Sequence, residues 1–323
     1  MTAVKVTGAL VLAAIAATMH LSAAAEKDEL PDVPMSLTQV TSNVYYVEGA
    51  AGVATENAGF VSNAGFVVTD EGVLVFDSLG TPALAARLVE LIRAVTEQPI
   101  RFVVLSHFHA DHAYGLQVFE ELGAEILASP GARDYLAAEI AGERLAERRV
   151  SLVPWVNEQT RLIMPDRFIN GDHRFTLGQH AFVASNLGAA HSEGDMTLFV
   201  EPDNVLFSGD IIFEGRIPFL GSANTRNWLA TLRRMQELKV TALIPGHGPA
   251  RENPRDMLAL TTRYLAYMRA QIGKAVEEWV PFDEAYEQIN WDEFVEYPAF
   301  LEANRRNAYA VYLSLEAESL QDK

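Results

Sequence analysis

Three histidines and an aspartate lie within six positions of the 323-residue chain, at His107, His109, Asp111 and His112. They follow the apolar segment 100–105, which has the composition of a strand buried on both faces. On an extended chain His107 and His109 point to the same side, and the turn after them can return the other two toward the same point. Packing does not explain four such side chains at one strand end. Imidazole and carboxylate together suit zinc, iron or manganese, so the sequence predicts a metal site.

Three more predicted strands lead to a potential metal ligand. Segment 181–184 leads to His191, segment 205–208 leads to Asp210, and segment 242–244 leads to His247. Glycines beside these residues allow the backbone to come close to a shared centre. Seven ligands are too many for one four-coordinate zinc and suit two metals. Two metals about 3.5–4 Å apart need a bridging group, and a carboxylate such as Asp210 can bridge them.

The order of these motifs resembles that of the metallo-β-lactamase-fold hydrolases. The resemblance covers roughly residues 37–250 and implies a mixed α/β fold, a four-layer αββα sandwich with the site at one edge of its two sheets. It also implies one metal on His107, His109 and His191 and a second on Asp111, His112 and His247. Asp210 would bridge the two metals. Asp77, which ends the predicted strand 73–76, matches an acidic residue that hydrogen-bonds a ligand histidine from behind.

The expected reaction is hydrolysis. Two divalent metals, zinc first with iron or manganese as alternatives, lower the pKa of a bridging water and make hydroxide the nucleophile. One metal polarises the substrate carbonyl or phosphoryl oxygen and stabilises the oxyanion. Asp111 is expected to be both ligand and catalytic residue, because it can orient the hydroxide and pass a proton to the leaving group.

The residue type at Asp210 indicates which branch of that family the chain resembles. The best-known β-lactamases of the fold carry Cys or Ser there, and one subclass has a Lys where this chain has Phe213. The Asp is more similar to the glyoxalase II, lactonase and phosphodiesterase branches, so we expect a small-molecule ester, thioester or lactone as substrate. Alternatives are a persulfide dioxygenase-like iron oxidoreductase, a weak β-lactamase, and a non-catalytic accessory of a periplasmic sulfur or quinoprotein system. The segments 213–219 and 304–309, with Asn224 and Trp228, are similar to those of exported zinc metallohydrolases that accompany such systems, so a periplasmic protein partner is a further option.

The elements that position these residues are predicted from periodicity. Strands are expected early, with a hairpin at 65–77, followed by alternating helices and strands that include helices at 82–95 and 132–149. The catalytic domain spans 37–250. The segment 251–323 is a helical C-terminal extension, interrupted at Pro281 and Pro298 and rich in aromatic residues. Those aromatics can pack the extension onto the sandwich or line a substrate pocket, and Trp155 and Arg161 can line the other wall.

Composition limits the function and location. The chain has 25 Lys+Arg against 43 Asp+Glu, a formal net charge of −18, and no cysteine. This excludes cysteine chemistry and disfavours binding to nucleic acid. Residues 1–25 are predicted to be a signal peptide cleaved near Ala25, followed by a linker at 26–36, so we expect a periplasmic or secreted protein. No stable membrane insertion is expected after cleavage.

Overall fold

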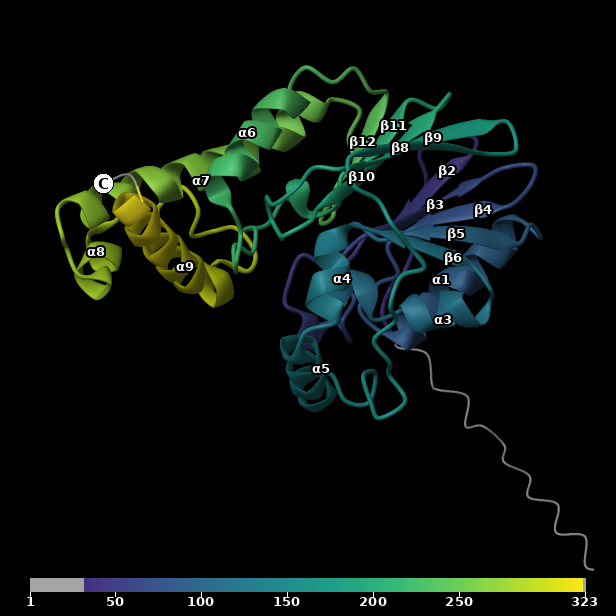
Figure 1. Cartoon of the computed structure of the whole chain (residues 1–323), viewed down its shortest axis with the longest axis horizontal. Helices are drawn as coiled ribbons and strands as arrows, with labels where there is room; N and C mark the ends of the chain where they lie inside the picture. The colour runs from purple at the N-terminus through teal and green to yellow at the C-terminus, as the bar shows by residue number, and fades with distance from the viewer. Residues whose placement is uncertain (1–31, 322–323) are drawn as a thin grey trace, which may run out of the picture.

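Two β-sheets lie face to face in the computed structural model, with helices on their outer sides (Figure 1). The structure describes residues 32–321, so the predicted signal peptide and most of the predicted linker lie outside the described residues. The first sheet has seven strands in chain order: β1 (Leu37–Gln39), β2 (Val44–Val47), β3 (Ala64–Val68), β4 (Val73–Phe76), β5 (Ile100–Val104), β6 (Glu125–Ala128) and β7 (Arg167–Phe168). The second has the order β12 (Ala242–Ile244), β11 (Val205–Phe207), β10 (Met196–Glu201), β9 (His180–Asn186) and β8 (Asp172–Leu177).

Parallel pairing brings the site-bearing strand ends to one edge of the sandwich. Strands β4, β5, β6 and β7 pair in parallel, and so do β11 and β12. The carboxyl ends of neighbouring parallel strands open at the same edge of a sheet. An apolar core between the two sheets holds them together, with Phe76, Phe182 and Phe207 fully or almost fully buried. The expected αββα architecture is therefore confirmed.

The helices on the first sheet begin at residues that favour helix starts, such as a capping Thr followed by Pro. Helix α1 (Pro82–Val95) starts with Pro82 after Thr81, whose side chain accepts a hydrogen bond from the Leu84 amide. Its buried face includes Leu84, Leu88 and Ile92. The helices α2 (Ala110–Ala113), α3 (Leu116–Glu121), α4 (Pro130–Leu136) and α5 (Glu139–Ser151) follow along the chain. A short 3₁₀ turn, η1 (Ala54–Glu56), lies between β2 and β3, and a second, η2 (Gly209–Ile211), follows β11 of the other sheet.

The prediction of one helix over 132–149 is wrong. Helix α4 begins earlier, because Ser129 caps it and Pro130 follows, and a break at Ala138 separates it from α5. Ala138 has an extended backbone, with φ −86° and ψ 152°. Alanine favours helix, so tertiary packing overrides local propensity at this position. The short edge strands β1 and β7 were not predicted.

The C-terminal helices pack on one another, and the core that they share includes Leu206 of β11 and Leu243 of β12. They are α6 (Thr225–Met235), α7 (Pro254–Glu277), α8 (Phe282–Gln288) and α9 (Phe300–Gln321). In Figure 1, α7, α8 and α9 form a unit at one end of the sandwich, and α8 and α9 begin just after the predicted breaks at Pro281 and Pro298. Their shared core contains Trp228, Tyr264 and Phe294, all buried. Most of the predicted aromatics pack there, whereas Trp279 is 78 % exposed. Within residues 32–321, no helix has the length and apolar character that crossing a membrane requires.

Candidate metal centre

The candidate ligands gather where four strands end: β5, β9, β11 and β12. His107 and His109 follow β5, and the short helix α2 behind them carries Asp111 and His112. His191 lies in the loop between β9 and β10. Asp210 sits in η2 just after β11, and His247 follows β12. All seven residues thus come from segments between 107 and 247, and the structure brings them into two adjoining groups.

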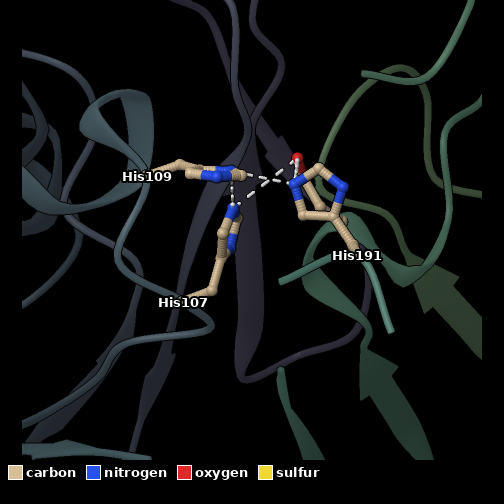
Figure 2. Close-up of side chains that lie close together, drawn as sticks. His107, His109 and His191 are labelled. Atoms are coloured by element: carbon tan, nitrogen blue, oxygen red, sulfur yellow. Dashed lines mark hydrogen bonds and ion pairs between the residues drawn. The ribbon is translucent and has the colours of Figure 1, made fainter. Parts of the chain in front are cut away.

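The first group contains His107, His109, His191 and Asp210. Nδ1 of His109 lies 2.9 Å from Nε2 of His107 and 2.9 Å from Nε2 of His191. Figure 2 shows the three imidazoles directed at one another from separate segments. Asp210 Oδ2 lies 3.2 Å from His191 Nε2 and 3.8 Å from His107 Nε2.

The second group contains Asp111, His112 and His247. Asp111 Oδ2 lies 3.6 Å from His112 Nε2 and 3.4 Å from His247 Nε2. Asp210 also faces this group, with Oδ1 3.1 Å from His112 Nε2 and Oδ2 3.3 Å from His247 Nε2. One carboxylate therefore touches both sets of histidines.

The donor set fits a pair of divalent cations. Ligand atoms on one tetrahedral zinc stand about 3.3 Å apart, so the observed spacings suit a shared ion. Nδ1 of His109 lies between the other two imidazole nitrogens but can make only one hydrogen bond, as donor or as acceptor, so one of the two contacts is not a hydrogen bond. His112 Nε2 and Asp210 Oδ1 are buried and have no hydrogen-bond partner. Buried polar atoms without partners are rare, and a cation between these groups would satisfy both.

Three ligand histidines are oriented by hydrogen bonds at their far nitrogen. Nδ1 of His112 bonds to Asp77 Oδ2 at 2.8 Å, and Nδ1 of His247 bonds to the Val61 carbonyl at 2.6 Å. Nδ1 of His107 lies 2.9 Å from Ser106 Oγ, which donates to Asp77 Oδ2 at 2.8 Å. A proton held at Nδ1 leaves the lone pair of Nε2 facing the centre. Asp77 thus supports one histidine of each group, directly and through Ser106.

Burial and charge set the protonation of the ligands. Burial holds the pKa of His107 well below its ordinary value and lowers that of His191 to about 3, so both are neutral donors at neutral pH. Burial alone would raise the pKa of Asp210, but the surrounding histidines outweigh it and hold this pKa well below its usual range. Burial opposes charge on His112 too, yet Asp210, Asp77 and Asp111 raise its pKa well above normal. Metal binding to His112 would therefore displace a proton.

Aromatic side chains and close backbone contacts fix the surroundings. Phe213 stacks on His247 with ring centroids 4.8 Å apart, and Trp228 packs edge-on against His191 at 5.2 Å. Gly209 has φ +52°, which favours glycine. A Cβ on Gly246 would lie 2.0 Å from Asp210 Oδ1, so only glycine fits beside that carboxylate as it stands.

The structure brings together all seven predicted ligands, and Asp77 lies behind them, in contact with His112 and Ser106. Arg161 does not line the site, because it pairs with Glu120 and Glu121 at the exposed end of α3. His180, a histidine outside the seven candidate ligands, starts β9 and lies 3.2 Å from Asp203. Sequence reasoning missed the role of Ser106, although a hydroxyl next to the first ligand was a usable signal. It also missed the Val61 carbonyl, which no sequence pattern marks.

Comparisons with known proteins agree with this geometry. A family model described as the metallo-beta-lactamase superfamily matches residues 57–247. An acyl-coenzyme A thioesterase of Gallus gallus is 29 % identical over 157 residues, 45 % of this chain and 55 % of that protein. The metallo-beta-lactamase IND-1 of Chryseobacterium indologenes is 23 % identical over 193 residues, 58 % of this chain and 72 % of that protein. The chain therefore spans only about half the length of the thioesterase.

Solved structures of similar fold include two further metallo-beta-lactamases. One from Pontibacter korlensis gives a TM-score of 0.56 at 20 % identity and covers 72 % of this chain and 99 % of that chain. Another from Hirschia baltica gives 0.56 at 19 % identity, with 72 % and 97 % covered. At these identities the likeness concerns the fold.

Proposed function

The chain belongs to the metallo-beta-lactamase superfamily, and from this premise we propose that it is a dinuclear metal-dependent hydrolase of an ester, thioester or lactone carbonyl. The observation that carries the proposal is the position of Asp210. Its Oδ2 lies 3.2 Å from His191 of the first group and 3.3 Å from His247 of the second. A single buried carboxylate shared by two sets of histidines is the arrangement that a pair of cations requires.

The residues would hold the metals as two sites joined at Asp210. His107, His109 and His191 would hold one ion, and Asp111, His112 and His247 would hold the other. When bound, such ions activate water and polarise the substrate carbonyl. Zinc suits this mixture of imidazole and carboxylate, with iron and manganese as alternatives.

Asp111 would transfer the proton of the attacking water to the leaving group. Its side chain is 27 % exposed, whereas that of Asp210 is 4 % exposed, so Asp111 lies on the open side of the centre. Burial would raise the pKa of Asp111, but His112 and His247 outweigh it and lower this pKa, so the carboxylate is ionised. Oδ2 faces the two histidines, which leaves Oδ1 to accept a proton and return it to the leaving group.

The substrate class rests on Asp210 and on one relative. Asp in place of the Cys or Ser of well-known lactamases favours acyl esters and thioesters over lactams. The similarity to an acyl-coenzyme A thioesterase makes thioesters the first substrates to test. A full set of seven candidate ligands disfavours a single-iron dioxygenase, which would use fewer.

We also propose that the protein acts in the periplasm, on the strength of the signal-like residues 1–25. Expression of the full chain in a Gram-negative host, followed by periplasmic extraction and N-terminal sequencing, tests this. A mature N-terminus near residue 26 is expected, and an intact Met1 in the cytoplasmic fraction would contradict it.

The test of function combines metal analysis with a substrate panel. Purified protein is loaded with zinc, manganese or iron and assayed on esters, thioesters, lactones, phosphodiesters and β-lactams. We expect about two metals per chain and hydrolysis of an acyl substrate. A metal content well under one per chain refutes the proposal. Oxygen consumption on a persulfide would favour the dioxygenase, and full loading without any hydrolysis would favour a non-catalytic accessory.

A further inference from the structure

Arg216 places a cation beside the proposed metal centre. It lies in the loop between η2 and α6, and one guanidinium nitrogen, Nη1, is 3.4 Å from Nδ1 of His247. Its side chain is half-buried, and its Nε is fully shielded from solvent. The proposed hydrolytic mechanism gives this residue no task.

The guanidinium lacks an acceptor in its own surroundings. Nδ1 of His247 donates its proton to the Val61 carbonyl, so it cannot also accept one from Arg216. Nε of Arg216 has no hydrogen-bond partner. Among the described residues, no carboxylate lies within ion-pair distance of this side chain, whereas exposed arginines such as Arg251 are paired.

The carboxylates nearest to Arg216 lie too far away to form an ion pair with its guanidinium. Burial lowers the pKa of Arg216, and Asp111, Asp210 and Glu302 oppose this only from a distance. Two of these three carboxylates are candidate metal ligands whose charge the cations would share. An arginine stays protonated at neutral pH even when it is partly buried, so Arg216 carries its positive charge and is incompletely solvated. A half-buried charge without a partner is costly, unless a ligand supplies the counter-charge.

The loop that carries Arg216 is held in place by the C-terminal helices. The Ile217 amide donates to the Pro298 carbonyl at 3.1 Å. Buried Asn307 of α9 accepts from the Leu220 amide at 2.9 Å and donates to the Pro218 carbonyl at 2.7 Å. These bonds flank Arg216 closely on its C-terminal side, so the guanidinium is presented on a fixed backbone. Pre-organised donors lose less entropy on binding a ligand.

We propose that Arg216 binds an oxyanion, a carboxylate or phosphate group, carried by the substrate outside the bond that is cleaved. Because Nε is shielded, the planar guanidinium would offer two parallel N–H bonds to such a group from its terminal nitrogens, Nη1 and Nη2. This inference rests on the proposed hydrolase function and adds a substrate class to it: acyl compounds with a second, negatively charged end. Arg216 would be a specificity-determining residue and would take no part in proton transfer.

Three matched thioesters separate the charge from the reacting bond. Hexanoyl-pantetheine is the neutral reference, adipoyl-pantetheine adds a carboxylate to the acyl side, and hexanoyl-4′-phosphopantetheine adds a phosphate to the thiol side. Each is assayed with wild-type protein, Arg216→Ala, Arg216→Lys and the control Arg251→Ala. The control removes the same charge from an exposed arginine that pairs with Glu214 at 3.1 Å. Metal content is measured for every variant.

The expected result is a selective loss. Arg216→Ala should lower kcat/KM on one of the two anionic thioesters by about 10- to 100-fold, the usual effect of losing a charged hydrogen bond. The neutral reference should change by less than about twofold, and Arg216→Lys should restore part of the loss. The anionic thioester that responds identifies the carboxylate or the phosphate. Equal losses on all three thioesters, or no loss on any, would overturn the inference.

A binding measurement decides the inference independently of turnover. Metal-loaded wild-type protein and Arg216→Ala are titrated calorimetrically with adipate, with neutral hexanamide and with inorganic phosphate. Weaker binding of adipate or phosphate to the variant, with hexanamide unchanged, supports the role of Arg216 even if no thioester is hydrolysed. In that case only the proposed function fails. Unchanged affinities for all three ligands would overturn the inference even if hydrolysis is observed.

Discussion

Replacing Asp77 with Asn tests how the protein prepares its histidines for metal. Asp77 is buried, and its Oδ2 accepts from Nδ1 of His112 and from Ser106 Oγ, both at 2.8 Å. Its Oδ1 accepts from the Ser106 amide at 2.7 Å. The backbone at Asp77 has φ +63°, a conformation that Asn tolerates as well as Asp. The substitution therefore changes the hydrogen bonding with little change in shape.

The amide of Asn has one acceptor oxygen, so it cannot accept all three hydrogen bonds that the carboxylate of Asp77 accepts. If its oxygen serves the Ser106 amide, its NH₂ group faces the N–H of His112, and two donors oppose each other. His112 relieves this by moving its proton to Nε2, which removes the lone pair that faces the centre. Loss of such a supporting partner typically costs about 10- to 100-fold in metal affinity. That corresponds to roughly 1.4–2.7 kcal/mol of binding free energy.

Competition with a chelator measures the effect directly. Metal-free wild-type protein and Asp77→Asn are titrated with zinc against a coloured chelator. We expect the dissociation constant of the more weakly bound zinc ion to be larger in the variant by that factor. Asp203→Asn is the matched control, because Asp203 also lies beside a histidine, His180, at 3.2 Å but far from the candidate ligands in the fold. Two equivalents bound by Asp77→Asn with wild-type affinity would refute the tautomer argument.

Three further predictions concern the centre. Asp210→Ala should leave about one metal per chain by elemental analysis and lower turnover by at least about 100-fold, and unchanged activity would contradict the dinuclear assignment. Gly246→Ala should also lose metal, because the added Cβ would lie 2.0 Å from Asp210 Oδ1, whereas Gly142→Ala in α5 meets no atom within 4 Å and should raise thermal stability by about 0.5–1 kcal/mol. In metal-free protein, burial lowers the pKa of His191 from 6.5 to about 3. The unfolded state then binds more protons, so the free energy of unfolding should fall as pH drops from about 6.5 toward 3. Thermal melts should show a shallower fall for His191→Gln.

The ligands could be predicted from sequence because they follow predicted strands. Apolar runs ending at His107, Asp210 and His247 identify strands whose carboxyl ends meet, and residue type then indicates metal. Helix α1 could be placed at its observed bounds for a similar reason, since Thr81, Pro82 and the apolar spacing agree.

The supporting contacts could not be predicted, because they join segments far apart in sequence. His247 bonds to the carbonyl of Val61, 186 positions away, and a carbonyl carries no residue-specific signal. The break at Ala138 also has no local mark. Arg216 could not be distinguished from other surface arginines by type alone. Its significance comes from what surrounds it, and the surroundings are set by tertiary packing.

In the segment 304–309, tertiary packing explains two asparagines whose role the sequence does not indicate. From sequence, Asn304 and Asn307 are two polar residues in an aromatic helix. In the structure both are fully buried, and each bonds to the hydroxyl of Tyr264 in α7, at 2.8 Å and 3.0 Å. Asn307 then reaches the loop that carries Arg216. A buried asparagine is costly unless its amide is satisfied, so these bonds fix the loop in one position relative to the helices. The C-terminal helices therefore hold the loop that carries Arg216. Under the role proposed for Arg216, residues 251–323 would influence substrate choice without supplying a metal ligand.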